Sequence, residues 1–384
     1  MTGRDQTHMI GTPTILVLGG YGETGRRIAR LLLAHTDAHV VVAGRRMSRA
    51  SAACDELNRE FVGLRARPRY GDAKDVYTLT AGLSGVDLVV VASTTAEYAA
   101  RVAEAAMAAG ADYLDCHFDP RVGPAIQALD GRARELNHCL ITQAGLFPGL
   151  PGVLVRALAG ATGRIERSRV AMAVSYRVTR PEPVVEVVQM ARNPQGDVLR
   201  DGQWRKAGWR DTEVFDFGGA FGRRRCYPLE MLEMREAANL FGLREGGLYI
   251  GGVNWFVDGV AFPLVMALAS TGRGAMVKPL ARLLAWGANT FTTTKPGVVV
   301  LAEGDGAWIR IEQADPHELG AMAVTACVRQ WLGGRLRRPG VLLAGLAADP
   351  AAMLEDLATF GADVRSSGPS ASPASARSPS TPPA

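Results

Sequence analysis

The sequence predicts an α/β protein, with a Rossmann-type doubly wound parallel sheet followed by a second α+β domain that contains a largely antiparallel sheet. Short, continuous apolar segments alternate about six times with helical segments over the first ~145 residues, as in a parallel sheet covered on both faces. A glycine-rich turn joins the first of these strands to the first helix. After residue 150 the pattern changes to alternating strands separated by turn signals.

Residues 14–149 form the predicted Rossmann domain, and each element follows from its pattern. Residues 14–18 are apolar and β-branched, and residues 26–34 carry apolar side chains at helical spacing. The same reasoning extends along the domain. Further strands are predicted at 39–43, 64–70, 88–92, 112–115 and 139–143, and further helices end near residue 61 or span 75–82, 97–109 and 123–136.

Residues 150–335 form the predicted substrate or dimerisation domain. Residues 169–178 alternate in polarity, which predicts a half-exposed strand, and Gly304-Asp305-Gly306 predicts a hairpin turn. The other predicted strands span 197–205, 247–257, 297–303 and 308–313, and the predicted helices span 152–158, 229–240, 262–270, 279–286 and 319–332.

The two ends of the chain have a different composition. Residues 1–13 are predicted to be flexible, and the Ser/Pro-rich residues 365–384 to be a disordered tail. Residues 336–364 are predicted to fold back on the Rossmann domain.

Composition and charge narrow the classes of function. With 384 residues, 47% hydrophobic and 21% charged, the chain is long enough for two globular domains. Its net charge of +5 comes from scattered arginines, so we predict no nucleic-acid partner, and no apolar run is long enough to predict a membrane span. Five widely spaced cysteines indicate free thiols in a cytoplasmic protein, without a metal site.

The glycine-rich turn is the first candidate site. Its residues fit the pattern G-x-G-x-x-G between a strand and a helix, the context in which that pattern binds dinucleotides. The glycines would allow the tight turn, the approach of the pyrophosphate and close helix–strand packing, and the start of the helix would face the phosphates. The alternative is a turn without a ligand. The residues are Gly20, Tyr21, Gly22, Glu23, Thr24 and Gly25.

The end of the second strand predicts which dinucleotide binds. NAD-binding sites usually place an acidic residue there, whereas this chain has Arg45 and Arg46. Guanidinium groups pair with a 2′-phosphate, so we predict NADPH in preference to NADH. Two further loops belong to the same edge of the sheet. Asp72 and Ala73 are expected beside the adenine, and Ser93 and Thr94 beside the ribose and nicotinamide.

Four residues are candidates for catalysis. His117 and Asp119 follow the fifth strand, at the carboxyl edge where ligands bind in such sheets. His117 is a candidate proton donor to a substrate nitrogen, and the alternative is a histidine that is only hydrogen-bonded in the loop. Tyr176 and Arg177 follow the first strand of the second domain, and Arg177 suits a substrate carboxylate. The alternative for this pair is an exposed sheet face.

Several segments together resemble the saccharopine dehydrogenase/reductase-like family of NAD(P)-binding oxidoreductases. They include VLGGYGETGR at 17–26, DLVVVAS at 87–93, AAGADYLD at 108–115 and GLFPGLP at 145–151. The resemblance implies hydride transfer between NADPH and a C=N bond of a small metabolite. The sequence departs from the family at Phe147, where relatives commonly have Asp, which puts saccharopine itself in doubt as the substrate.

Two other functions remain open at this point. One is an enoyl (C=C) reductase of the same superfamily, and the other is a redox-silent NADP(H) sensor. The apolar helix faces of the second domain predict either core packing or a homodimer interface; their residues are Met231, Met234, Leu240, Phe262, Leu264 and Leu268.

Overall fold

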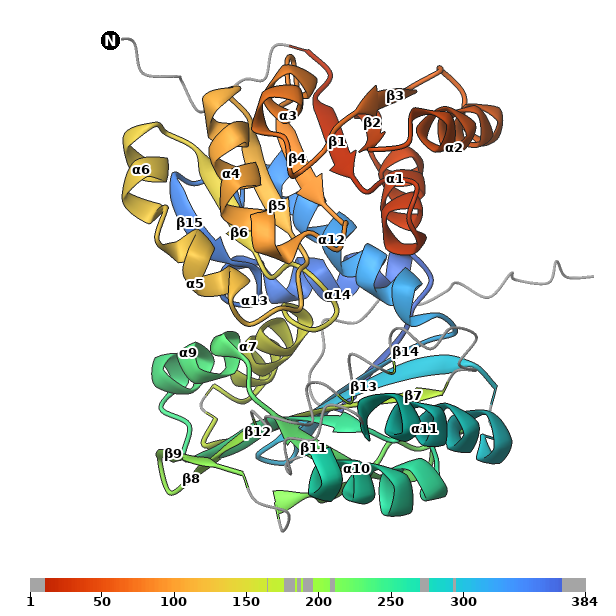
Figure 1. Ribbon diagram of the computed structural model, residues 1–384. Coiled ribbons are helices and arrows are strands. Elements are labelled where there is room, and N and C mark those ends of the chain that lie inside the picture. The colour runs from red at the N-terminus through yellow and green to blue at the C-terminus, as the bar shows by residue number, and fades with distance from the viewer. Residues whose placement is uncertain are drawn as a thin grey trace, which may run out of the picture.

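Two β-sheets, one above the other, organise the computed structural model (Figure 1). The structure describes residues 11–163, 165–175, 184, 188, 196–207, 211–269, 276–292 and 295–367. Most of the predicted flexible N-terminus and of the predicted tail therefore lies outside the described residues.

The first sheet is parallel throughout, with strand order β15-β6-β5-β4-β1-β2-β3. This confirms the predicted Rossmann-type architecture. The outermost strand, β15, comes from the C-terminal segment and pairs with β6. The strands are β1 (Thr14–Leu18), β2 (His39–Gly44), β3 (Ala66–Tyr70), β4 (Leu88–Val91), β5 (Asp112–Asp115), β6 (Cys139–Thr142) and β15 (Gly340–Leu343).

Helices cover both faces of this sheet because alternate strand residues enter different cores. Ile15 and Val17 of β1 belong to one apolar cluster, and Leu16 and Leu18 to another. The helices and the single 3₁₀ turn of this layer are α1 (Glu23–His35), α2 (Met47–Glu60), α3 (Val76–Gly82), η1 (Ala96–Tyr98), α4 (Ala99–Ala108), α5 (Val122–Gln127), α6 (Asp130–Glu135) and α12 (Pro316–Leu332).

Helix α12 comes after most strands of the second sheet in the chain, but in space it belongs to the first sheet. We assigned residues 319–332 to the second domain, yet α12 lies against α1. At its end the buried Trp331 donates a hydrogen bond from Nε1 to Asp112 Oδ2, at 2.8 Å. Asp112 is the first residue of β5, so the C-terminal end of α12 lies where the strands of the first sheet begin. Helix α12 therefore runs along the strand direction, between the amino and the carboxyl ends of the strands.

The second sheet is mostly antiparallel, as predicted, with strand order β10-β11-β12-β7-β13-β14-β16. Only the pairing of β12 with β7 is parallel along this order. Asp305 and Gly306 have positive φ in the predicted β13–β14 turn. The strands are β7 (Arg167–Ser175), β8 (Asp197–Arg200), β9 (Gln203–Lys206), β10 (Glu213–Asp216), β11 (Arg223–Leu229), β12 (Glu245–Gly251), β13 (Gly297–Gly304), β14 (Ala307–Gln313) and β16 (Asp363–Ser367).

Strand β7 differs from the prediction. We expected a half-exposed strand, but Val170 and Ala171, which point to opposite faces, are both fully buried. Val170 packs in the main core, while Ala171 packs with Phe215, Phe217 and other residues that cover the far face. Strands β10 and β11 were not predicted, and β11 begins with three consecutive arginines, Arg223–Arg225.

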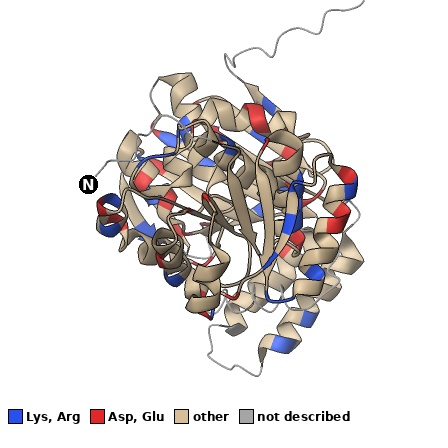
Figure 2. Cartoon of the chain, turned by 90° about the horizontal axis from the view of Figure 1, so that it is seen from above, with Lys and Arg blue, Asp and Glu red and all other residues tan. Residues whose placement is uncertain are grey.

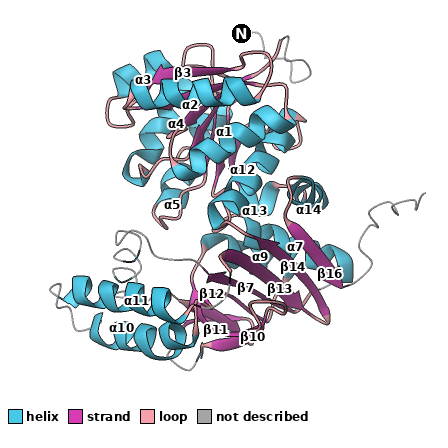
Figure 3. Cartoon of the chain, turned by 90° about the vertical axis from the view of Figure 1, so that its right-hand side faces the viewer, coloured by secondary structure: helices cyan, strands magenta, loops and turns pink. Residues whose placement is uncertain are grey.

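Two groups of helices flank the second sheet. One group lies between the two sheets (Figures 1 and 3): α7 (Leu150–Thr162), α9 (Leu232–Phe241), α13 (Ala344–Ala347) and α14 (Pro350–Thr359). The other forms a separate apolar cluster beside the sheet: the π-helix η3 (Val257–Ala261), α10 (Phe262–Ala269) and α11 (Val277–Phe291). The first group places the loop after β6 at the junction of the two sheets.

The last described residues, 363–367, form β16 and pair with β14. The predicted tail therefore starts at least three residues too early, since Arg365, Ser366 and Ser367 belong to this strand. These residues form a strand because their backbone pairs with residues more than 50 positions earlier. The local Ser-rich composition does not indicate that contact.

Charged residues of both signs are interspersed over the face seen from above in Figure 2. All five cysteines are free thiols. Within the described ranges, no group of three or more His, Cys, Asp or Glu side chains is arranged to hold a metal ion. No helix in the described part of the chain is both long and apolar enough to cross a membrane.

Candidate functional site

The glycine-rich turn lies at the carboxyl edge of the first sheet, between β1 and α1. Its backbone is tightly folded: Gly20 N donates to Val17 O at 3.1 Å, and Gly22 N donates to Gly19 O at 2.9 Å. A Cβ atom at Gly25 would collide with the carbonyl of Gly19. Glycine at position 25 therefore lets the first turn of α1 lie directly on the loop, as the dinucleotide pattern requires.

The end of β2 contacts the same loop through Tyr21. Its ring lies against Gly44, where a Cβ atom would come within 2.5 Å of Tyr21 Cε1. The Tyr21 hydroxyl accepts a hydrogen bond from Arg46 N at 3.2 Å. Tyr21 therefore connects the glycine-rich turn to the chain segment that carries Arg45 and Arg46.

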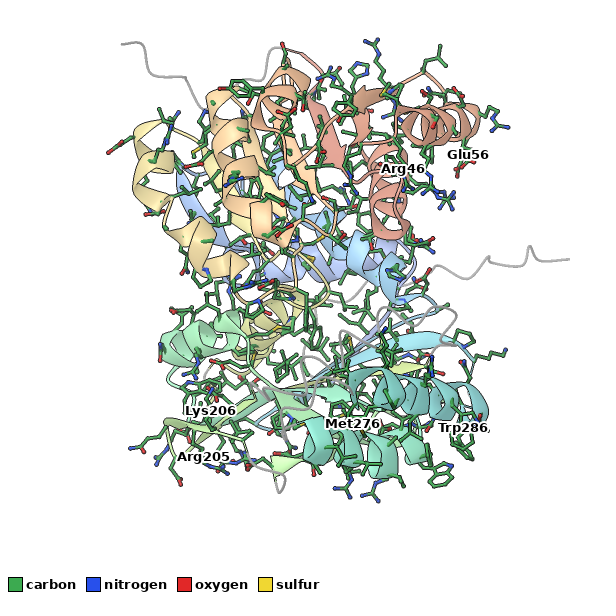
Figure 4. All side chains as sticks on the ribbon, viewed as in Figure 1. Arg46, Glu56, Arg205, Lys206, Met276 and Trp286 are labelled. Atoms are coloured by element: carbon green, nitrogen blue, oxygen red, sulfur yellow. The ribbon has the colours of Figure 1, made fainter. Side chains whose placement is uncertain are left out.

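The side chains of Arg45 and Arg46 are exposed, and neither forms a salt bridge with a described residue. Figure 4 shows Arg46 on the side of the first domain that carries α1 and α2, together with Glu56. Glu56 pairs with Arg26 at 3.3 Å. The nearby acid is therefore engaged elsewhere, and both guanidinium groups remain available for an anionic ligand.

The loops after β3 and β4 complete this part of the edge. Asp72 Oδ1 accepts from Lys74 N at 3.0 Å, so its carboxylate shapes its own turn, and Ala73 is buried. After β4, Ser93 and Thr95 share a hydrogen bond of 2.7 Å, while Thr94 is exposed. A Cβ atom at Gly19 would lie 2.8 Å from Ser93 Cβ, so the loop after β4 touches the glycine-rich turn.

Buried polar atoms gather where β5 and β6 end. Asp115 is fully buried, and its Oδ1 accepts from the backbone N of His117 at 3.1 Å and of Gln143 at 3.3 Å. Within the part of the chain that the structure describes, Asp115 Oδ2, His117 Nε2, Thr142 Oγ1 and Gln143 Oε1 are buried without a hydrogen-bond partner. Such groups are uncommon in folded proteins and call for an explanation, of which a polar ligand is one.

The protonation of His117 follows from its surroundings. Burial lowers the pKa of His117, although the negative charges of Asp115 and Asp119 oppose this. The imidazole is therefore neutral at pH 7. Burial, followed by the charge of Asp115, raises the pKa of the neighbouring Tyr113 well above its ordinary value. Both side chains are buried, so a ligand must enter this polar region to exchange a proton with either of them.

The other candidate catalytic residues have different outcomes. Asp119 forms an ion pair with Arg121 at 2.5 Å, and hydrogen bonding to Arg121 lowers the pKa of Asp119. Its carboxylate therefore remains ionised and engaged within its own loop. Tyr176 and Arg177 lie outside the described residues, directly after the last described residue of β7.

A buried carboxyl group supports the loop that follows β6. Glu233, in the first turn of α9, is fully buried, and its Oε1 accepts from Gly149 N at 2.9 Å. Its other oxygen faces Gly152 of α7 and Gly345 of α13, where Cβ atoms would crowd it. Burial raises the pKa of Glu233 to about 7, against the hydrogen bonds from the Gly149 and Gly152 backbone.

Sequence reasoning missed three residues of this region. Asp115 was treated only as the end of a strand, although a carboxylate at that position of a parallel strand is a usable signal. Gln143 follows β6 in the same way, and its positive φ marks an unusual backbone position. Glu233 has no local signal, because its partners come from two distant segments, the start of α7 and α13.

The residues at this edge fit a dinucleotide. A side chain at position 25 would collide with Gly19, and one at position 19 would collide with Ser93. The start of α1 therefore presents backbone atoms, rather than side chains, to a ligand. No acidic residue follows β2 until Asp55, and two arginines that form no salt bridge with a described residue stand there instead. The donor set therefore suits a phosphate-bearing ligand.

Comparison with known families supports this assignment of the first domain. Residues 15–140 match the family model of the saccharopine dehydrogenase NADP-binding domain. No curated protein sequence matches the chain significantly. The predicted resemblance is thus confirmed, and the match covers the β1–β6 part of the first sheet.

Comparison with solved structures extends the likeness to the whole chain. The structure is similar to saccharopine dehydrogenase (L-Glu forming) from Saccharomyces cerevisiae, with 12% identity, a TM-score of 0.65, and 93% of this chain and 100% of that chain covered. It is also similar to the homospermidine synthase of Legionella pneumophila solved with NAD, with 11% identity, a TM-score of 0.58, and 98% and 96% covered. At these identities the likeness concerns the fold.

Together the comparisons confirm the saccharopine dehydrogenase-like, NAD(P)-binding oxidoreductase fold. They give no support to the enoyl reductase or to the redox-silent sensor. One of the two structures was solved with NAD, so the comparisons do not favour NADPH over NADH.

Proposed function

From the premise that residues 15–140 are an NADP-binding domain of the saccharopine dehydrogenase type, we propose that this protein is an NADP(H)-dependent oxidoreductase acting on a C=N bond of a small metabolite. The observation that carries the proposal is the group of buried, unpartnered polar atoms at the ends of β5 and β6. These strands follow β4 and β1 in the sheet, so the polar group lies along the same edge as the glycine-rich turn.

The cofactor would be held by residues that the sequence already indicated. The backbone of Gly20–Gly25 and the first turn of α1 would bind the pyrophosphate, and Arg45, with Arg46, would bind the 2′-phosphate. Asp72 and Ala73 would lie beside the adenine, and Ser93 and Thr94 beside the nicotinamide half. When bound, the nicotinamide supplies or accepts the hydride. The preference for NADPH rests on the unpaired arginines.

The proton transfer is assigned to His117. In the oxidative direction the neutral imidazole accepts the proton that leaves the substrate nitrogen as a C–N bond becomes C=N. In the reductive direction the ring must first take up a proton, which it then donates to the nitrogen. Asp115 would orient His117 through its backbone and stabilise the imidazolium form by its charge.

Arg177 would bind a substrate carboxylate, with Tyr176 beside it. A cytoplasmic location is consistent with the free cysteines. A homodimer would cover the exposed Leu240 and Leu264, which are 64% and 43% exposed, whereas Met231 and Met234 are core residues.

The test is a titration of the purified protein with NADPH and with NADH, followed by nicotinamide fluorescence. Tight binding with a preference for NADPH is expected. Pairs of amines and oxo acids would then be screened for oxidation of the bound cofactor, with enones as the control substrates. Failure to bind either nucleotide would refute the proposal, and turnover of enones alone would replace the C=N assignment.

A further inference from the structure

A histidine from the C-terminal half of the chain reaches the start of α1. His317 lies in the first turn of α12, and its Nδ1 is 3.2 Å from the hydroxyl of Thr24. Thr24 is the second residue of α1 and part of the glycine-rich motif. The two residues are 293 positions apart, so only the tertiary structure brings them together.

Ion pairs hold the two helices in this position. Arg27 of α1 pairs with Asp315 at 2.5 Å and with Glu318 at 3.3 Å, on either side of His317. Arg27 also pairs with Glu23 at 3.0 Å. The three carboxylates therefore share the single positive charge of Arg27, while the side chain of His317 itself is exposed.

The direction of α12 places this histidine at the ligand-binding edge. The helix ends at the start of β5, where Trp331 binds Asp112, and it begins beside the start of α1. Its first turn is therefore at the carboxyl edge of the first sheet, like the first turn of α1. The backbone N–H groups at the start of α1 point toward this edge and favour an anion there. The start of α12 is capped by Asp315, whose Oδ1 accepts from His317 N at 2.8 Å, so α12 contributes the side chain of His317.

We infer that His317 is a cofactor-binding residue that contacts the pyrophosphate of the bound dinucleotide from outside the nucleotide-binding domain. When the Thr24 hydroxyl donates to Nδ1, the neutral ring carries its proton on Nε2, which is then a donor for a phosphate oxygen. The inference rests on the proposed binding of NADP(H). It adds a contact that lies outside residues 15–140 and that couples the cofactor to the second sheet through β14, which directly precedes α12.

Two ligands separate this contact from the rest of the site. NADPH contains the pyrophosphate, whereas adenosine 2′-monophosphate has the adenine, ribose and 2′-phosphate without it. We would measure the dissociation constants of both by calorimetry for the full-length protein, the variants His317→Ala and His317→Gln, and the control His35→Gln. His35 ends the same helix α1, far from its first turn.

His317→Ala should weaken NADPH binding by about five- to tenfold, as expected for loss of one hydrogen bond to a charged group, and leave adenosine 2′-monophosphate unchanged. His317→Gln, which keeps a donor, should lose less, and His35→Gln should bind both ligands normally. Unchanged NADPH binding in His317→Ala, or equal weakening of both ligands, would overturn the inference while the proposed function stands. A wild-type protein that binds no NADPH would overturn both.

Discussion

The buried carboxyl of Glu233 makes the stability of this protein depend on pH in a direction unusual for a glutamate. Burial raises its pKa to about 7 from an ordinary value of 4.5. Between these pH values the folded protein holds a proton that the unfolded chain has released. Stability should therefore fall as the pH rises from about 4.5 through about 7, and level off above it. One pKa unit corresponds to about 1.4 kcal/mol, so a shift from 4.5 to about 7 amounts to a loss of at most about 3.5 kcal/mol.

The variant Glu233→Gln isolates this contribution because every other titrating group is common to both proteins. Its amide oxygen can still accept from Gly149 N, and crowding of its NH₂ group against Gly152 and Gly345 adds a cost that does not depend on pH. Relative to the variant, the wild type should lose about 2 to 3 kcal/mol of stability between pH 5 and pH 8.

The assay is urea unfolding at pH 5, 6, 7 and 8, followed by tryptophan fluorescence. The control is Glu236→Gln, which removes an exposed glutamate of the same helix and should follow the wild type at every pH. Parallel stability profiles for the wild type and Glu233→Gln would refute the reasoning, because they would show that the Glu233 carboxyl ionises as readily in the folded protein as in the unfolded chain.

Three further variants test the cofactor and proton-transfer assignments. Arg45→Asp should weaken NADPH binding at least about tenfold and NADH binding much less, since it replaces a partner of the 2′-phosphate by a carboxylate of the same charge sign as the phosphate. A fluorescence titration in which both affinities fall equally would contradict this. The control is Arg59→Asp, at the far end of α2. His117→Ala should lower turnover without changing NADPH affinity. In the wild type, amine oxidation should slow as the pH falls and His117 becomes protonated, at a pKa below its usual value of about 6.5, and the variant should lack this pH dependence. A variant with the same pH–rate profile as the wild type would remove His117 from the mechanism. Gly25→Ala should lower the free energy of unfolding by about 1 to 3 kcal/mol, and with it the thermal midpoint, because the added Cβ collides with the Gly19 carbonyl. The control Gly131→Ala, where a Cβ meets open space, should leave the midpoint unchanged. Equal midpoints in both variants would count against the close approach of Gly25 to Gly19.

The local patterns of the first domain were sufficient to predict its fold. Apolar strands of four to six residues and a glycine-rich turn report a buried parallel strand and the helix that follows it, and neither depends on distant residues. The candidate residues Gly20–Gly25 and Arg45 were identified from the same local sequence of strand, turn and helix. They lie at the carboxyl edge because they directly follow strands that all run in the same direction.

Segments whose environment is set by distant parts of the chain were harder to predict. Strand β11 begins with the basic run Arg223–Arg225, and its buried Cys226 packs in a core that other strands supply. Strand β15 is short, and it pairs with β6, about 200 positions earlier. Phe147, at the family's usual Asp position, is 7% exposed and packs in the core.

The sequence by itself determined the Rossmann-type domain, the glycine-rich turn and the arginines at the end of β2, because short-range periodicity and turn chemistry encode them. Only the tertiary structure revealed the buried group around Asp115 and Gln143, the carboxyl of Glu233 among three glycines, and the contact of His317 with Thr24. The physical reason is that burial and hydrogen-bond partners depend on which segments meet in space. The contacts of Asp115 with Gln143, of Glu233 with Gly149 and of His317 with Thr24 join residues 28, 84 and 293 positions apart along the chain.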